Sequence, residues 1–99
     1  MARVYIYHSY KLKEEESEQD FLLVAEKFSK DSGLKTKGFI SWTLLRDGKI
    51  WSDILVYESI DDFKNANEII HKNPLAHELV SFFDIASITE HCFTVAAGT

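Results

Sequence analysis

The sequence predicts an α+β protein of the ferredoxin-like type, with element order βαββαβ and a four-stranded antiparallel sheet. The first observation is a hairpin signal at Asp47-Gly48, because Asp-Gly between two apolar runs is typical of a two-residue turn. The second is that a strand-like and a helix-like segment precede this hairpin, and a helix-like and a strand-like segment follow it. With right-handed crossovers, this order gives the strand order 4-1-3-2 with both helices on one face of the sheet.

The first half of the chain supplies one strand and one helix. Residues 3–10 are rich in β-branched and aromatic side chains, which predicts the first strand. Ser17 followed by Asp20 is typical of a helix start, since a serine caps the helix and a carboxylate is favourable in its first turn. Apolar residues then recur at helical spacing, and Gly33 is expected to end this helix.

The second half supplies the hairpin, two helices and the last strand. The hairpin strands are expected at residues 37–46 and 49–58, and Ser59 is expected to cap the second helix. Pro74 should end that helix, because the residue before a proline disfavours the helical conformation. A shorter helix at residues 75–83 and a last strand at residues 86–95 complete the predicted fold.

The Asp47-Gly48 turn also predicts which residues face each other in the hairpin. With these two residues at the centre of a type I′ turn, Leu45 pairs with Ile50, Trp42 with Asp53, and Phe39 with Val56. Because strand side chains alternate, one face carries Ile40, Trp42, Leu44, Trp51, Asp53, Leu55 and Tyr57. The opposite face carries Phe39, Ser41, Thr43, Leu45, Ile50, Ser52, Ile54 and Val56.

Neither face is polar, so both need a cover. The helices are expected over the face with Ser41, Thr43 and Ser52, where small side chains leave room for a cavity. A second copy of the sheet is expected over the other face, which predicts a homodimer.

Length and charge narrow the class of protein. The 99 residues make one domain, residues 1–99, with 45% hydrophobic and 13% aromatic residues, as in a globular protein. The net charge is −5 and no lysine or arginine cluster occurs, which argues against nucleic acid and anionic membranes as partners. The single cysteine cannot form an internal disulfide, and no secretory or membrane-spanning segment is expected, so the predicted location is the cytoplasm.

The stretch Trp51-Ser-Asp-Ile-Leu-Val-Tyr-Glu-Ser-Ile-Asp-Asp-Phe, with the later Pro74 and His91, carries a family resemblance over nearly the whole chain. The chain resembles the dimeric α/β-barrel superfamily, in particular the small antibiotic-biosynthesis-monooxygenase-like proteins. The resemblance implies two ferredoxin-like protomers packed sheet to sheet, each with a small-molecule pocket between helices and sheet. It also implies a cofactor-free monooxygenase or isomerase acting on a small aromatic or polyketide-like molecule. The alternative is a non-catalytic ligand-binding or stress-associated dimer.

Haem-degrading members of that superfamily use an asparagine in the first strand and a tryptophan in the second helix. This chain has tyrosines and His8 in its first strand and no tryptophan after Trp51. No haem or other cofactor is therefore expected.

Asp53 and His91 are the candidate catalytic residues. A carboxylate among apolar strand residues needs a hydrogen-bond donor, so Asp53 is either a general base or a structural group bonded to a tryptophan N–H or to the dimer partner. His91, in the last strand, could shuttle a proton or be a half-buried strand histidine. With one strand between them, the two residues are expected to flank a bound molecule about 10 Å apart.

Four aromatic residues, Trp42, Trp51, Tyr57 and Tyr7, are candidates for binding a flat substrate, although packing in the barrel interior explains them equally well. His71 and His77 are expected on helix surfaces, and Cys92 as a buried strand thiol. The histidines lack ligand spacing supported by Cys or acidic neighbours, so no metal is expected.

Overall fold

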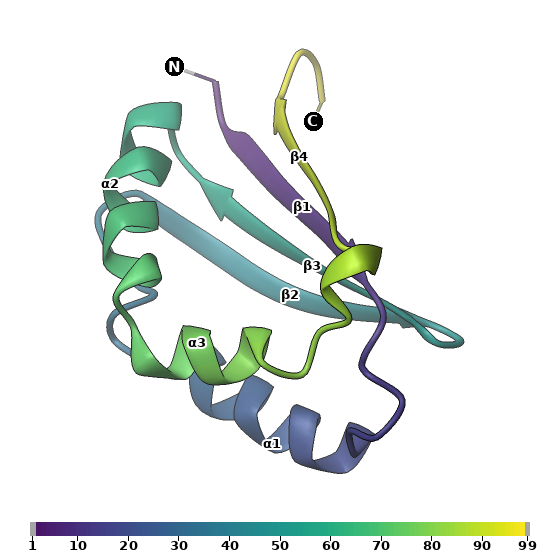
Figure 1. The fold of residues 1–99 in the computed structure, drawn as a ribbon. Helices are drawn as coiled ribbons and strands as arrows, with labels where there is room; N and C mark the ends of the chain where they lie inside the picture. The colour runs from purple at the N-terminus through teal and green to yellow at the C-terminus, as the bar shows by residue number, and fades with distance from the viewer. Residues whose placement is uncertain (1, 99) are drawn as a thin grey trace.

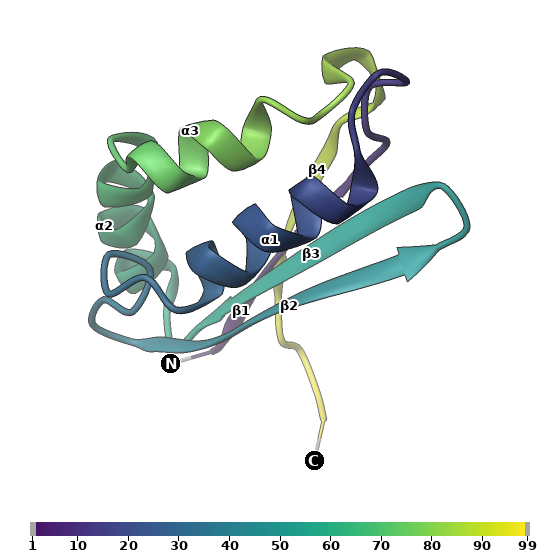
Figure 2. The same ribbon diagram turned by 90° about the horizontal axis from the view of Figure 1, so that it is seen from below.

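The computed structural model describes residues 2–98, and the predicted ferredoxin-like topology is confirmed (Figure 1). The elements are β1 (Val4–Tyr10), α1 (Glu18–Ser29), β2 (Phe39–Asp47), β3 (Ile50–Tyr57), α2 (Ile60–His71), α3 (Pro74–Val80), a 3-10 turn (Ile85–Ser87) and β4 (Thr89–Thr94). All strand pairs are antiparallel, in the order β2-β3-β1-β4. The helices lie on one side of the sheet, and the chain after β4 leaves on the other side (Figure 2).

Side-chain caps begin the helices where the sequence indicates. The hydroxyls of Ser17 and Ser59 accept hydrogen bonds from the backbone N–H three residues later, in the first turns of α1 and α2. Asn73 caps α3, and Pro74 takes its first position, where its missing N–H costs nothing. The Asn73-Pro74 step therefore turns the chain sharply between α2 and α3, which run in different directions (Figure 1).

The predicted register of the hairpin is wrong, because the turn lies one residue later than expected. Asp47 pairs with Ile50, so Gly48 and Lys49 form the turn, and only Gly48 of these residues has a positive φ, of 61°. This is the pattern of a type II′ turn, in which only the first central residue needs a positive φ. Gly48 takes that position, so Asp47 keeps a negative φ. As a result Trp42 pairs with Leu55, and Leu44 pairs with Asp53.

The shift moves each partner by two residues, so it leaves most side chains on their predicted faces. The exception is a bulge between Phe39 and Ser41, which pairs Phe39 with Tyr57 instead of Val56. Phe39 thereby joins the core face, where its ring meets that of Tyr57 edge to face.

The helices cover the opposite face from the one expected. Trp51, Leu55 and Tyr57 are buried beneath them and pack with α1 residues such as Phe21 and Phe28. The prediction that Ser41, Thr43 and Ser52 lie under the helices is therefore wrong, because the large apolar side chains of β3 are the ones that need burial.

The uncovered face of the sheet is rich in exposed apolar side chains. Five of them belong to strands or the segment after β4: Tyr5, Leu45, Ile50, Phe93 and Val95. None of the described helices is long and apolar enough to cross a membrane.

Smaller differences occur at element ends. The helix α1 ends at Ser29, before Gly33. The last strand begins at Thr89 and not at residue 86, because a 3-10 turn at Ile85–Ser87, capped by Asp84, and its C-cap Ile88 precede it. Cys92 is exposed and not buried as the sequence predicts, since β4 is an edge strand.

Candidate functional site

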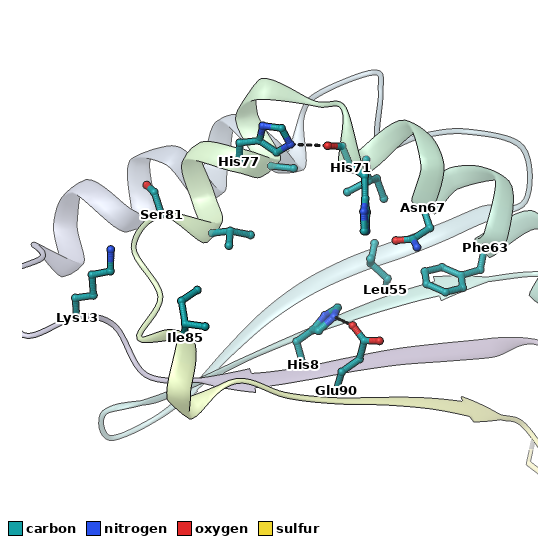
Figure 3. A pocket seen from close by; sticks show the side chains of 13 residues that line it. His8, Lys13, Leu55, Phe63, Asn67, His71, His77, Ser81, Ile85 and Glu90 are labelled. Atoms are coloured by element: carbon teal, nitrogen blue, oxygen red, sulfur yellow. Dashed lines mark hydrogen bonds and ion pairs between the residues drawn. The ribbon is translucent and has the colours of Figure 1, made fainter.

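A two-lobed pocket lies between the sheet and the pair α2 and α3 (Figure 3). The larger lobe has a volume of about 650 Å³, and the smaller, deeper lobe about 240 Å³. Six residues line both lobes, which makes them one continuous site: His8, Leu55, Ile70, Ala76, Val80 and Glu90. This volume suits a small molecule of one to three rings.

The polar floor of the pocket comes from three adjacent strands. His8 on β1 faces Asp53 on β3 and Glu90 on β4, so the three side chains stand in one row across the sheet. Nδ1 of His8 lies 2.9 Å from Oδ1 of Asp53, and Nε2 lies 2.7 Å from Oε2 of Glu90. The histidine therefore bridges two carboxylates.

The two carboxylates differ sharply in exposure. The Asp53 side chain is 8% exposed and also accepts a hydrogen bond of 3.2 Å from the buried hydroxyl of Tyr10. The Glu90 side chain is 65% exposed, at the pocket rim. Asp53 is thus a fixed partner of His8, whereas Glu90 can move away into solvent.

Burial by itself lowers the pKa of His8, but the hydrogen bonds and negative charges of Asp53 and Glu90 outweigh it, so the pKa is raised above 6.5. The same environment keeps Tyr10 neutral. Burial first, and then the charge of Asp53 and the hydrogen bond to it, raise the pKa of the Tyr10 hydroxyl well above its usual range. Tyr10 is therefore a donor that orients Asp53 and not a proton source.

The upper wall of the larger lobe comes from the helices. Phe63 and Ile70 of α2 and Val80 of α3 supply apolar surface, and His71 points from α2 toward Leu55 (Figure 3). His77 lies at the start of α3, where its Nε2 donates to the backbone carbonyl of His71. The sharp Asn73-Pro74 step is what lets both helices contribute to this wall.

The structure separates the residues that the sequence predicts for the site. Asp53 and Trp42 both line the deeper lobe, as diagonal neighbours instead of the expected direct pair. Trp51 and Tyr57 are core residues: Trp51 packs edge to face on Phe21, and the Tyr57 hydroxyl donates to the backbone carbonyl of Leu34.

Tyr7 and His91 lie on the uncovered face, opposite to Asp53. They pair with each other across β1 and β4, and the Tyr7 hydroxyl is 3.2 Å from the hydroxyl of Ser52. The expectation that His91 and Asp53 flank one molecule within a protomer is therefore wrong, because the β4 register turns the two side chains to opposite sides of the sheet.

Sequence reasoning missed His8, Tyr10 and Glu90 as site residues. The signal that could have found His8 is the alternation in β1, where Val4 and Ile6 mark the core face and His8 follows them on that face. The two helix histidines, expected on the surface, both line the pocket rim. Within residues 2–98, no three His, Cys, Asp or Glu side chains are grouped so as to hold a metal ion.

The fold resembles several solved structures. A mutant form of SnoaB from Streptomyces nogalater, a cofactor-independent oxygenase, aligns with a TM-score of 0.78 and 19% identity over 97% of this chain and 95% of that chain. A dimeric ferredoxin-like protein from an uncultured marine organism gives a TM-score of 0.72 and 17% identity over 100% and 92% of the two chains. A proposed antibiotic biosynthesis monooxygenase from Nitrosomonas europaea gives 0.73 and 8% identity over 98% and 93%.

No model of a protein family matches the sequence, and no curated protein matches it significantly. The fold resemblance to antibiotic-biosynthesis-monooxygenase-like proteins that the sequence predicts is confirmed by these neighbours. At these identities the likeness establishes the fold and leaves the reaction to the chemistry of the pocket.

Proposed function

We propose that this protein, which has the fold of a cofactor-independent oxygenase, is a cofactor-free oxygenase or isomerase acting on a small aromatic or polyketide-like molecule. The observation that carries the proposal is the His8–Asp53 pair on the floor of an otherwise largely apolar pocket. A histidine oriented by a buried carboxylate is a recurrent arrangement for moving a proton near neutral pH.

In this proposal His8 is the catalytic residue and Asp53 positions it. The Asp53 carboxylate accepts a hydrogen bond from the N–H at Nδ1, which leaves Nε2 as the atom that exchanges a proton with the substrate once Glu90 has moved aside. When Glu90 moves aside, the proton on Nε2 passes to water, and the neutral ring then takes a proton from an acidic O–H or C–H of the substrate. The electron pair of the broken bond stays on the substrate as an enolate or phenolate.

Two outcomes are then open to the enolate. In an isomerisation the proton returns from His8 to a different carbon, with no change in oxidation state. In an oxygenation dioxygen is the co-reactant: a ring CH₂ group and O₂ give a C=O group and water, so the substrate carbon is oxidised and dioxygen is reduced. Neither outcome needs a metal or an organic cofactor, because an electron-rich enolate is itself the reductant.

The pocket walls support a flat substrate. Trp42 lines the deeper lobe and packs edge to face on Phe28, which gives a firm aromatic surface below α3. Of the four predicted substrate-binding residues, Trp42 retains that role in the proposal.

We also propose that two copies pack through the uncovered faces of their sheets, in a cytoplasmic homodimer. The exposed apolar side chains of this face include Tyr5 and Phe93. Apolar surface gathered on one face in this way is typical of a protein–protein interface. In this assembly Tyr7 and His91 would lie between the two sheets, away from the pockets, and the fold similarity to a dimeric ferredoxin-like protein supports it.

The alternative is a non-catalytic ligand-binding dimer. The observation that favours it is that both ring nitrogens of His8 are already occupied by carboxylates. The mobility expected of the exposed Glu90 side chain weighs against it, as does the open access of the pocket to Asp53.

The experiment compares two histidines on opposite sides of the sheet. His8→Gln and His91→Gln are assayed with the wild type against a panel of hydroquinone-like and anthrone-like compounds, by oxygen uptake and by proton exchange in NMR. We expect turnover by the wild type and a loss of about 100-fold or more in His8→Gln only. No turnover by the wild type, or loss in His91→Gln with His8→Gln still active, would contradict the assignment.

A further inference from the structure

Glu90 occupies the position that a ligand of His8 would take. Its carboxylate lies 2.7 Å from Nε2 of His8, both residues line the larger lobe, and Glu90 belongs to the edge strand β4. Because this side chain is 65% exposed, moving it into water breaks few other contacts. An acceptor on a bound molecule can therefore replace it.

The charges around His8 favour an anionic acceptor. A protonated His8 and the buried Asp53 neutralise each other, and the exchange of one carboxylate for another acidic group leaves that balance intact. A neutral ligand, by contrast, would remove a charge partner from the imidazolium.

The other titratable groups of the larger lobe also favour an anionic ligand. Four of its lining residues carry basic side chains, namely His8, Lys13, His71 and His77, and Glu90 is its one acidic residue. Lys13 comes from the segment after β1, and the two helix histidines lie across the lobe from His8 (Figure 3). In a chain with net charge −5, the ionisable groups that line this lobe are thus mainly basic.

The remaining walls are apolar. Leu55 rises from the sheet, and Phe63, Ile70, Val80 and Ile85 surround the lobe from α2, α3 and the 3-10 turn. Such walls bind the hydrocarbon body of a ligand and leave its polar group to the strand side chains.

We infer that the pocket takes a small, flat, apolar molecule with one acidic group, an enol, phenol or carboxylic acid, which binds His8 in place of Glu90. The inference names the substrate class of the proposed active site and rests on that use of the pocket. In the empty protein, Glu90 then stands where the anion of the substrate will stand, beside the same imidazolium.

The test uses two probes of nearly equal shape, 2-naphthoate and its neutral counterpart 2-naphthylmethanol. Their affinities are measured by calorimetry at pH 7 for the wild type, Glu90→Gln, His8→Gln and Glu68→Gln. Glu68 is an exposed carboxylate of α2 outside the pocket lining, so its variant controls for the loss of one negative charge.

We expect the wild type to bind 2-naphthoate about tenfold more tightly than the alcohol. This ratio corresponds to the free energy that a charge-assisted hydrogen bond typically contributes. Glu90→Gln should strengthen 2-naphthoate binding several-fold and leave the alcohol unchanged, while Glu68→Gln changes neither. His8→Gln should abolish the preference for the acid. If His8→Gln does not fold, the ¹⁵N spectrum of His8 in the wild type replaces it, and saturation with 2-naphthoate should keep the ring doubly protonated.

Equal affinity for the two probes, weaker 2-naphthoate binding in Glu90→Gln, or no binding of either probe would overturn the inference. These binding results do not depend on turnover. Acid-selective binding without any catalysis would support the inference and contradict the proposed enzymatic function. Turnover without acid selectivity would support the proposed function and contradict the inference.

Discussion

The Nδ1 atom of His8 lies 2.9 Å from the Oδ1 atom of Asp53, directly across the pairing of β1 and β3. This contact fixes the plane of the imidazole ring and the nitrogen that points to the pocket. Since Tyr10 donates to the other carboxylate oxygen of Asp53, the aspartate itself is held from two sides. Orientation of the histidine is thus built into the sheet.

Asp53→Asn should lower turnover by about 100-fold while the protein stays folded. The amide can donate its N–H to Nδ1 of His8, which leaves the proton on Nε2, the atom that must accept one. The rate is measured as kcat/KM with the best compound of the panel. Asp47→Asn, an exposed change in the hairpin, is the matched control and should retain full activity. Equal rates for both variants would contradict the role of Asp53.

The stability of the protein should depend on the charge of His8. Because the folded protein raises the pKa of His8 above 6.5, the protonated ring stabilises the fold below about pH 6.5, and this contribution is lost as the pH rises through the raised pKa. The free energy of unfolding in urea is measured from pH 5 to 9 for the wild type and His8→Gln. We expect the advantage of the wild type to shrink with rising pH, by at most about 1.4 kcal/mol per pH unit. The other three histidines, His71, His77 and His91, are present in both proteins, so their contributions cancel in this difference. An advantage that grows with pH would refute the prediction.

The two tryptophans should report differently on ligand binding. Trp42 lines the deeper lobe, whereas Trp51 is 3% exposed in the core. In protein labelled with 5-fluorotryptophan, addition of 2-naphthoate should shift one of the two ¹⁹F signals. The Trp51→Phe variant assigns the shifted signal, which should remain in its spectrum as that of Trp42. A shift confined to Trp51 would place the ligand elsewhere.

Phe93→Lys should weaken the proposed dimer. Phe93 is 54% exposed on the uncovered face of the sheet, where a charge would be buried between two copies. We expect the dissociation constant of the dimer, measured by sedimentation equilibrium, to rise about tenfold or more. Leu23→Lys on α1 is the control, because Leu23 is 56% exposed on the helical side. A monomeric wild type, or equal weakening by both variants, would argue against this interface.

The element order could be predicted from local signals alone. The caps Ser17 and Ser59 and the Pro74 break are set by hydrogen bonds within a few residues, and the structure has all three in place. The hairpin register is harder to predict, because Asp47-Gly48 and Gly48-Lys49 both supply a two-residue turn, and only strand pairing along the whole hairpin decides between them.

The site is harder to predict from the sequence than the fold, because it depends on pairing between strands that are distant in the sequence. Asp53 can be recognised as a carboxylate among apolar neighbours, but His8 and Glu90 join it only through the β1–β3 and β1–β4 registers. The wrong prediction of the covered face has the same origin. Both faces of the hairpin are apolar, and only the packing of Phe21 of α1 on Trp51 and of Phe63 of α2 on Tyr57 distinguishes them.

The sharp step at Asn73-Pro74 has a consequence for how such a pocket can diversify. The row of His8, Asp53 and Glu90 stands on three strands, while much of the apolar wall of the pocket stands on α2 and α3, which this corner joins. Substitutions along α3 can therefore change the shape of the pocket and leave this row of polar side chains in place. The contour of the pocket and its polar chemistry can thus vary independently of each other.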